Sequence, residues 1–176
     1  VIGFEVLLDA LEALGKPILT AVNGLGLGIG LTILLHTDIN FMANEAKLKC
    51  PFVTLGVVPE AGSSFLLPHV IGYQRTAELL FSARYMGAAE ALAVGLVLET
   101  LPRAELMARV MSVASSIALQ PPASVRETKR LMRHATRGET RAARERENEE
   151  FKRRMVSPEF REAMMAFQEK RAPNFD

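Results

Sequence analysis

The residues from Gly24 to Gly30 are arranged to bind a negatively charged oxygen through the main chain. Glycine occupies every second position of this segment, between apolar runs at 17–22 and 31–35. Glycine admits backbone conformations and close approaches that a side chain would block. A helix that starts here leaves N–H groups unpaired, and these groups favour a developing negative charge. The segment is therefore a candidate oxyanion hole.

These glycines have two other interpretations. The spacing G-x-G-x-G-x-G departs from the G-x-G-x-x-G fingerprint of dinucleotide-binding folds, so a nucleotide site is not expected. A purely structural role, in which the glycines let a helix pack closely on a sheet, stays open on this segment alone.

Further motifs follow in a definite order. Residues 16–39 read K-P followed by the glycines and D-I, residues 55–62 read L-G-V-V-P-E-A-G, and residues 87–97 read G-A-A-E-A-L-A-V-G-L-V. From about Phe4 to the C-terminus the chain resembles the crotonase superfamily, also called the enoyl-CoA hydratase/isomerase family. The resemblance implies an α/β fold with a crotonase-like (ClpP/crotonase) β-β-α superhelix core and a C-terminal helical region. It also implies an acyl-CoA thioester substrate and no cofactor beyond the coenzyme A that the substrate carries.

The resemblance also predicts how the chain is organised. Residues 1–102 would form the crotonase-like core, and residues 103–176 would form the helical region that the family uses for trimerisation and as a lid. The core is N-terminally incomplete against the family pattern, since the segment that supplies the family's other oxyanion donor would lie upstream of Val1. The resemblance also implies a homotrimer or a hexamer, because trimers and dimers of trimers are common in the family.

The two glutamates that handle water in hydratases of this family have no counterpart here. Their places are occupied by Thr32 and Phe52. Addition of water to a double bond needs groups that activate the water and deliver a proton, and these two side chains cannot supply that pair.

A carboxylate stands nearby at Glu60, within P-E-A-G. The surrounding residues 51–64 look most like those of the peroxisomal-type 3-enoyl to 2-enoyl-CoA isomerases, which need a single acid. Such an acid removes a proton from C2 and returns it to C4. The resemblance places the enolate-binding donor at the main-chain N–H of Ile29, and losing one such donor typically costs about 3–4 kcal/mol. The apolar neighbours of Glu60 are expected to raise its pKa toward working pH.

The remaining substrate contacts are expected in three places. The glycine segment and the loop before Glu60 would line the acyl-CoA site, and the A-F-Q-E-K-R ending would reach the coenzyme A, with an ammonium group on a phosphate. A lysine that only faces solvent is an equally good interpretation of that ending. The residues concerned are Gly26, Leu27, Gly28, Phe52, Leu55, Gly56, Phe167 and Lys170.

Two functions other than isomerisation fit the same residues. One is a degenerate enoyl-CoA hydratase or another acyl-CoA lyase. The other is a non-catalytic crotonase-like module used for binding or assembly, which Thr32, Phe52 and the missing donor segment favour. By composition alone, Glu60 reads as an ordinary exposed turn carboxylate, and only its place in the family motif favours catalysis.

The bulk properties exclude several classes. The chain has 176 residues, 49% hydrophobic residues and a formal net charge of +1, so neither nucleic acid nor a membrane surface is an expected partner. A lone cysteine, Cys50, allows no internal disulfide and reads as a packed thiol. We expect bacterial cytoplasm or an organelle with a reducing interior, and no secretion. The three histidines lack metal-ligand spacing, so no metal site is expected.

Periodicity predicts elements that would carry these residues. A strand–helix–strand unit is expected to hold the glycines, and a turn at 57–64 to hold Glu60, with Ser63 or Ser64 capping the helix that follows. Helices are expected at 4–14, 29–36, 74–83, 103–119, 123–135 and 139–155, and strands at 18–22, 38–43 and 47–52. A final helix is expected to start at 157–159, with Ser157 as its N-cap and Pro158 in its first turn.

Overall fold

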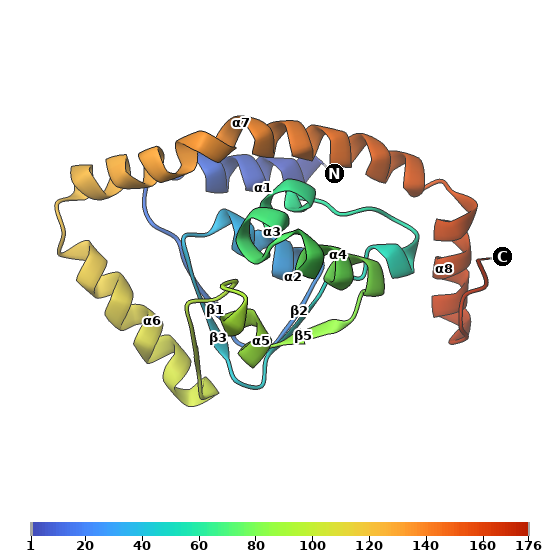
Figure 1. Ribbon diagram of the computed structural model, residues 1–176, viewed down its shortest axis with the longest axis horizontal. Helices are drawn as coiled ribbons and strands as arrows, with labels where there is room; N and C mark the ends of the chain where they lie inside the picture. Colours follow the sequence, from blue (N-terminus) through green and yellow to red (C-terminus); the bar gives the residue numbers. More distant parts are fainter. Residues whose placement is uncertain (1, 176) are drawn as a thin grey trace.

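The computed structural model describes residues 2–175, and Val1 and Asp176 lie outside the described part. Two small sheets lie at its centre (Figure 1). The first sheet is parallel throughout, in the order β1-β3-β6, with β1 at Leu19–Val22, β3 at Ile39–Ala43 and β6 at Glu99–Leu101. The parallel pairing of β1 with β3 confirms the predicted strand–helix–strand unit.

The second sheet holds the glycine segment. Strand β2 (Leu25–Leu27) pairs in parallel with β4 (Lys47–Lys49), which pairs antiparallel with β5 (Tyr85–Gly87). The predicted helix over 29–36 is only partly right, because α2 (Ile29–Thr32) gives way to the 3₁₀ helix η1 (Ile33–His36). The side chains of Thr37 and Asn40 both donate to the carbonyl of Leu34. These hydrogen bonds from residues after η1 stabilise its 3₁₀ geometry.

Helices cover the sheets and enclose a single apolar core. The short η2 (Val53–Leu55) precedes the Glu60 turn, and the helices that follow are α3 (Ser63–Ile71), α4 (Tyr73–Ser82) and α5 (Ala88–Ala93). The core contains the fully buried Phe41, Met42 and Leu48, together with side chains from α4 and α5.

Three C-terminal helices frame this core in Figure 1. They are α6 (Arg103–Ala118), the long α7 (Pro122–Arg154) and α8 (Pro158–Glu169). Ser157 caps α8 as its sequence predicts, accepting from the N–H of Phe160 at 3.1 Å.

The prediction of two helices at 123–135 and 139–155 is wrong, because α7 runs through Gly138 without a break. A glycine lowers helix stability by only about 1 kcal/mol. Ion pairs attach both halves of α7 to the rest of the fold, which offsets that loss. Lys129 and Arg133 pair with Asp38 on one side of Gly138, and Arg144 pairs with the first helix on the other.

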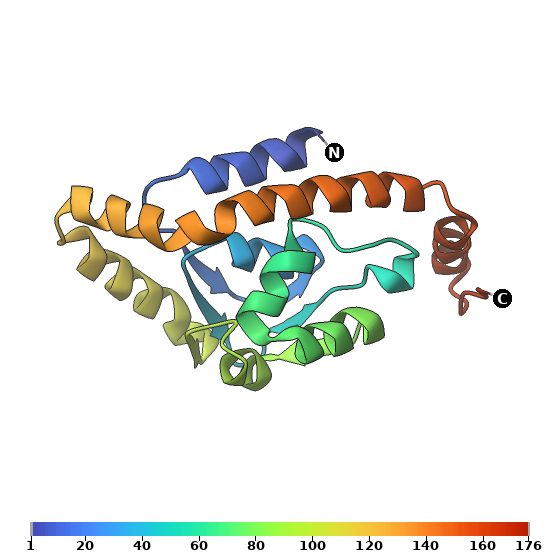
Figure 2. The same ribbon diagram turned by 45° about the horizontal axis from the view of Figure 1, so that its top comes forward.

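The first helix, α1 (Ile2–Ala13), lies alongside α7, as both Figure 1 and Figure 2 show. Helix α6 starts at the predicted division of the chain at residue 103, yet its Leu106 and Val110 belong to the same core as the sheets. Because α6 packs into the core of the sheets, the predicted boundary between a core and a helical region at residue 103 stays a prediction. None of the helices within residues 2–175 has both the length and the apolar character needed to cross a bilayer.

Candidate active site

The glycine segment ends in a backbone turn that exposes main-chain donors. Gly28 has a left-handed φ of 51°, and its own N–H donates to the carbonyl of Lys49 at 2.9 Å. Its carbonyl accepts from Leu31 and Thr32, which starts α2. The N–H groups of Ile29 and Gly30 donate to no backbone acceptor in the described chain. Two donors therefore point from the start of α2 without a protein partner.

A packing role also applies to this segment, at Gly26. A methyl group added to Gly26 would lie 2.7 Å from Leu48 Cδ2 and 2.9 Å from the carbonyl oxygen of Gly30. The helix start therefore approaches strand β2 more closely than any other residue type allows. Of the predicted contact residues, Gly26 is buried and Leu27 is exposed. The two interpretations left open by the sequence thus apply to different glycines.

Glu60 lies beside the glycine segment. A methyl group added to Gly28 would be 3.9 Å from Glu60 Oε1 and 3.9 Å from Phe52 Cε1. The Glu60 carboxyl makes no hydrogen bond or ion pair with the residues in 2–175, although its main-chain carbonyl accepts from Ser63. A free carboxyl group, an aromatic ring and a turn with unpaired N–H groups therefore meet at Gly28.

The surroundings of Glu60 change its proton affinity. Burial raises the pKa of the Glu60 carboxyl above its ordinary value, and the nearby charges of Glu147 and Glu5 raise it further. Cys50 is fully buried, and burial together with the charge of Glu60 raises its pKa to about 12. The interpretation of Cys50 as a packed thiol is confirmed, because such a thiol is not ionised at neutral pH.

Thr32 and Phe52, the residues at the hydratase positions, are both buried. The Thr32 hydroxyl has no hydrogen-bond partner within the described chain, and the Phe52 ring lies beside Gly28. The carboxylate nearest to this centre is thus Glu60, with Glu147 and Glu5 close enough to affect its pKa.

The predicted serine cap on α3 is wrong. Ser63 and Ser64 are the first residues inside α3, and Gly62 in the left-handed region precedes them without a side-chain cap from its own turn. The cap comes from α7, where Glu147 accepts from the N–H of Gly62 at 2.5 Å and of Ser64 at 2.7 Å. A carboxylate from a distant helix has thus replaced a local hydroxyl.

Sequence reasoning missed Glu147 because it stands in a densely charged stretch. The buried residues of this stretch follow helical spacing, but the sequence does not show which face they form, because two of the four are charged. They are Thr140, Ala143, Arg144 and Glu147.

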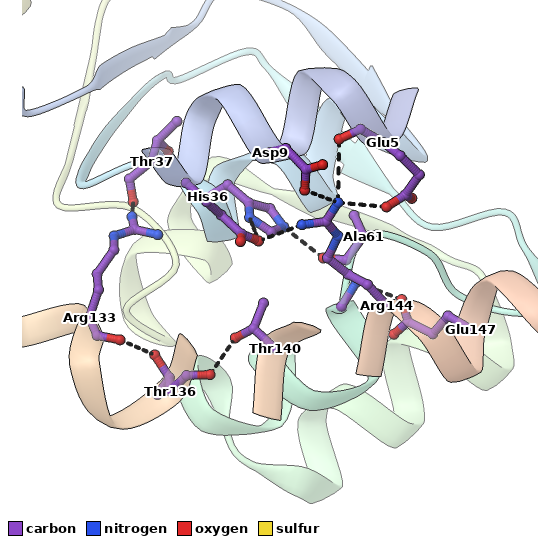
Figure 3. Close-up of polar contacts among 12 residues, drawn as sticks. Glu5, Asp9, His36, Thr37, Ala61, Arg133, Thr136, Thr140, Arg144 and Glu147 are labelled. Atoms are coloured by element: carbon purple, nitrogen blue, oxygen red, sulfur yellow. Dashed lines mark hydrogen bonds and ion pairs between the residues drawn. The ribbon is translucent and has the colours of Figure 1, made fainter. Parts of the chain in front are cut away.

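His36 supports the same turn from the other side. Its Nε2 lies 2.6 Å from the carbonyl oxygen of Ala61, and because a carbonyl only accepts, Nε2 carries the hydrogen and donates it. Burial lowers the pKa of His36, which favours its neutral form. Figure 3 shows this hydrogen bond from His36 to Ala61, with Arg144 close by.

The C-terminal contact residues lie at the end of this loop. Gly56, with φ 66°, meets the start of α8, since a methyl group there would lie 2.7 Å from the nitrogen of Phe160. Phe167 and Leu55 share the lining of a cavity of about 310 Å³ between η2 and α8. Lys170 ends α8 in a left-handed conformation, with its side chain exposed. Their contacts with substrate stay predictions. Within residues 2–175, no group of three or more histidine, cysteine or acidic side chains could hold a metal ion.

Residues 2–176 match the sequence model of a family described as enoyl-CoA hydratase/isomerase. A short-chain-enoyl-CoA hydratase of Clostridium acetobutylicum is 33% identical over 161 residues, which are 92% of this chain and 62% of the relative. Enoyl-CoA delta isomerase 2 of Rattus norvegicus is 34% identical over 152 residues, which are 86% of this chain and 39% of the relative. The chain thus spans less than two thirds of the length of these relatives.

The fold has solved counterparts. The crystal structure of an enoyl-CoA hydratase/isomerase from Pseudoalteromonas atlantica superposes with a TM-score of 0.93 and 40% sequence identity, covering 96% of this chain and 68% of that one. The crotonase-like fold expected from the motifs is therefore confirmed.

Proposed function

Because this chain belongs to the enoyl-CoA hydratase/isomerase family, we propose that it acts on acyl-CoA thioesters and moves a double bond from the 3 to the 2 position. The observation that carries this proposal is the place of the Glu60 carboxyl, which lies free beside Gly28 at the start of α2. Glu60 is the general base and then the general acid. The coenzyme A portion of the substrate is the sole cofactor that this reaction requires.

The reaction has two proton transfers. The Glu60 carboxylate takes a proton from C2 of a 3-enoyl thioester, and the electron pair of that C–H bond moves into a dienolate whose oxygen carries the charge. The N–H of Ile29, which has no backbone acceptor in the described chain, donates to that oxygen. The protonated Glu60 then gives the same proton to C4, and the double bond is left between C2 and C3.

The raised pKa of Glu60 suits both steps. A base with a pKa nearer working pH takes up a proton from carbon more readily than an ordinary carboxylate does. A single carboxyl also serves both transfers, so the reaction needs no group at Thr32 or Phe52.

Glu60→Gln tests this proposal. The native protein is expected to convert a 3-hexenoyl-CoA to the conjugated 2-enoyl product. The variant should lose at least about a hundredfold in kcat while its Kd for the thioester stays close to native. Full isomerase activity in the variant would refute Glu60 as the base.

Hydration is the second candidate, favoured by the name of the Clostridium relative. Its test is the addition of water to crotonyl-CoA under the same conditions. Hydration faster than isomerisation by the native protein would give this candidate precedence. Absence of both activities together with absence of acyl-CoA binding would favour an assembly module.

Self-association and a reducing compartment complete the proposal. A trimer or a dimer of trimers would cover apolar side chains that the helical region leaves exposed, namely Met107, Met111, Leu119, Leu131 and Met132. The free thiol of Cys50 suits bacterial cytoplasm or an organelle with a reducing interior.

A further inference from the structure

The corner that follows Glu60 has a costly backbone conformation. Ala61 and Gly62 are both left-handed, with φ values of 62° and 70°. An alanine in this region costs about 1–2 kcal/mol relative to a right-handed conformation. Such a conformation persists only where surrounding contacts hold it. The direction of the Glu60 side chain depends on this corner, because the two residues follow it directly.

Helix α7 supplies the contacts that hold the corner. The two carboxylate oxygens of Glu147 accept from Gly62 and Ser64, at 2.5 and 2.7 Å. Glu147 is only 6% exposed, so these two bonds take the place of water. Thr140 of the same helix closes the other side of Gly62, because a methyl group there would lie 3.2 Å from its Cγ2. Figure 3 shows Glu147 and Arg144 side by side at this corner.

We propose that Glu147 is a positioning residue, whose carboxylate fixes the corner at Ala61 and Gly62 and so directs the carboxyl of Glu60 toward Gly28. This inference rests on the proposed role of Glu60 as the acid–base group. Glu147 itself does not touch the substrate, and it acts through the two N–H groups that it accepts from. Its carboxylate has both oxygens committed to the corner, which distinguishes it from the exposed glutamates of the same helix.

The charge of Glu147 gives a second effect that a purely structural cap would not have. The pKa of Glu60 is raised by burial first, then by the charges of Glu147 and Glu5 from α7 and α1. Burial raises the pKa of Glu147 itself, and the N–H groups of Gly62 and Ser64 and the charge of Arg146 act against this rise. Removing the negative charge of Glu147 should therefore lower the pKa of Glu60. Since the base must be ionised, the acid limb of the pH profile would move to lower pH.

Glu147→Gln in the purified native protein tests the proposal. Its amide keeps one acceptor oxygen, so one of the two N–H groups loses its partner. We expect kcat with a 3-enoyl-CoA to fall about ten- to a hundredfold, KM to stay within about twofold, and the acid limb of kcat/KM to move to lower pH. Glu149→Gln, an exposed residue on the same helix, removes the same charge and should change none of these quantities.

A crystal structure of Glu147→Gln gives a readout that does not depend on activity. The proposal predicts that the Glu60 carboxyl moves away from Gly28. A Glu60 side chain in its native place, with kcat and the pH profile unchanged, would overturn the proposal even if the variant unfolds more easily. If the native protein proves inactive while Glu60 still moves in the variant, the proposed function fails and the positioning role stands.

If Glu147→Gln does not fold, Glu147→Asp carries the same comparison. It keeps the charge but shortens the side chain by one methylene. Lower kcat with an unshifted acid limb would support positioning, and native kcat would refute it.

Discussion

At the residue scale, the candidate site is marked by polar groups that have no hydrogen-bond partner in the protein. The Glu60 carboxyl and the N–H groups of Ile29 and Gly30 have no partner in residues 2–175, whereas nearby polar groups such as Glu147 are fully engaged. The sequence motif predicted both Glu60 and the turn at Gly28, and the structure brings them together. Glu147 could not be predicted by motif, because its partners are main-chain groups 83 and 85 residues away.

The raised pKa of Glu60 leads to a prediction about stability. The folded protein holds the Glu60 proton more tightly than the unfolded chain, so this contribution to stability is present at low pH and is lost as pH rises through the folded-state pKa. Glu60→Gln removes a carboxylate that is costly to ionise. Thermal unfolding should therefore show a Tm higher than native by about 2 °C above about pH 7, and the difference should shrink toward about pH 4.

The matched control is Glu149→Gln, whose exposed side chain should leave Tm within about 1 °C of native at both pH values. A Glu60→Gln variant that is less stable than native at high pH would mean that the ionised carboxyl is stabilised by its surroundings.

At the scale of elements, the sequence predicts periodic segments but not the ion pairs between residues far apart in the chain. The strand–helix–strand unit and the cap of α8 follow from local patterns and are confirmed. The continuity of α7 through Gly138 does not follow from local patterns, because it depends on ion pairs with Asp38 before this glycine and with α1 after it. Local glycine signals predict a break only when no such contacts offset them.

Two glycines in the same segment should respond differently to alanine. In Gly26→Ala the new methyl group would meet Leu48 and the backbone of Gly30 at under 3 Å. This substitution should destabilise the protein by about 3 kcal/mol or prevent folding. In Gly28→Ala the methyl group has room, with its nearest neighbours 3.9 Å away. The cost then comes from the backbone alone, because φ 51° and ψ −110° lie outside the regions that alanine favours, and it should be about 2 kcal/mol.

Urea unfolding and isomerase assays separate these outcomes. Gly28→Ala should fold and bind the thioester weakly, because its methyl group occupies the space between the turn and Glu60. Equal stability of the two variants would contradict the assignment of Gly26 to packing and Gly28 to the site.

At the scale of the whole molecule, α7 connects the first helix to the corner at Ala61 and Gly62. Arg144 is 4% exposed and contacts two acidic side chains of α1 that Figure 3 labels, Glu5 and Asp9. It also pairs with Glu12, further along the same helix. This arrangement was not predicted, since the charged stretch of α7 reads as a solvated face and nothing local marks one arginine as buried. The helical region therefore helps to build the site rather than only covering it.

Arg144→Ala should weaken the whole fold. It leaves the carboxyl groups of Glu5 and Glu12 partly buried without their cation, and breaking such a pair costs about 3 kcal/mol or more. Urea unfolding would measure this loss. Arg141→Ala, at an exposed position one turn earlier, should change the free energy of unfolding by less than about 0.5 kcal/mol. Equal changes in the free energy of unfolding for the two substitutions would show that the ion pairs of Arg144 with α1 do not contribute to stability.

The fate of deuterium at C2 of a 3-enoyl-CoA that is dideuterated at this carbon, followed by NMR, tests Glu60 as the base most directly. Loss of deuterium from C2 reports removal of hydrogen next to the thioester, whether Glu60 delivers it to C4 or loses it to solvent. The native protein should move deuterium from C2 to C4, and Glu60→Gln should show no loss from C2 above the uncatalysed rate while it still binds the thioester. Loss from C2 at the native rate in Glu60→Gln would mean that another group removes the hydrogen, and Glu60 would not be the base.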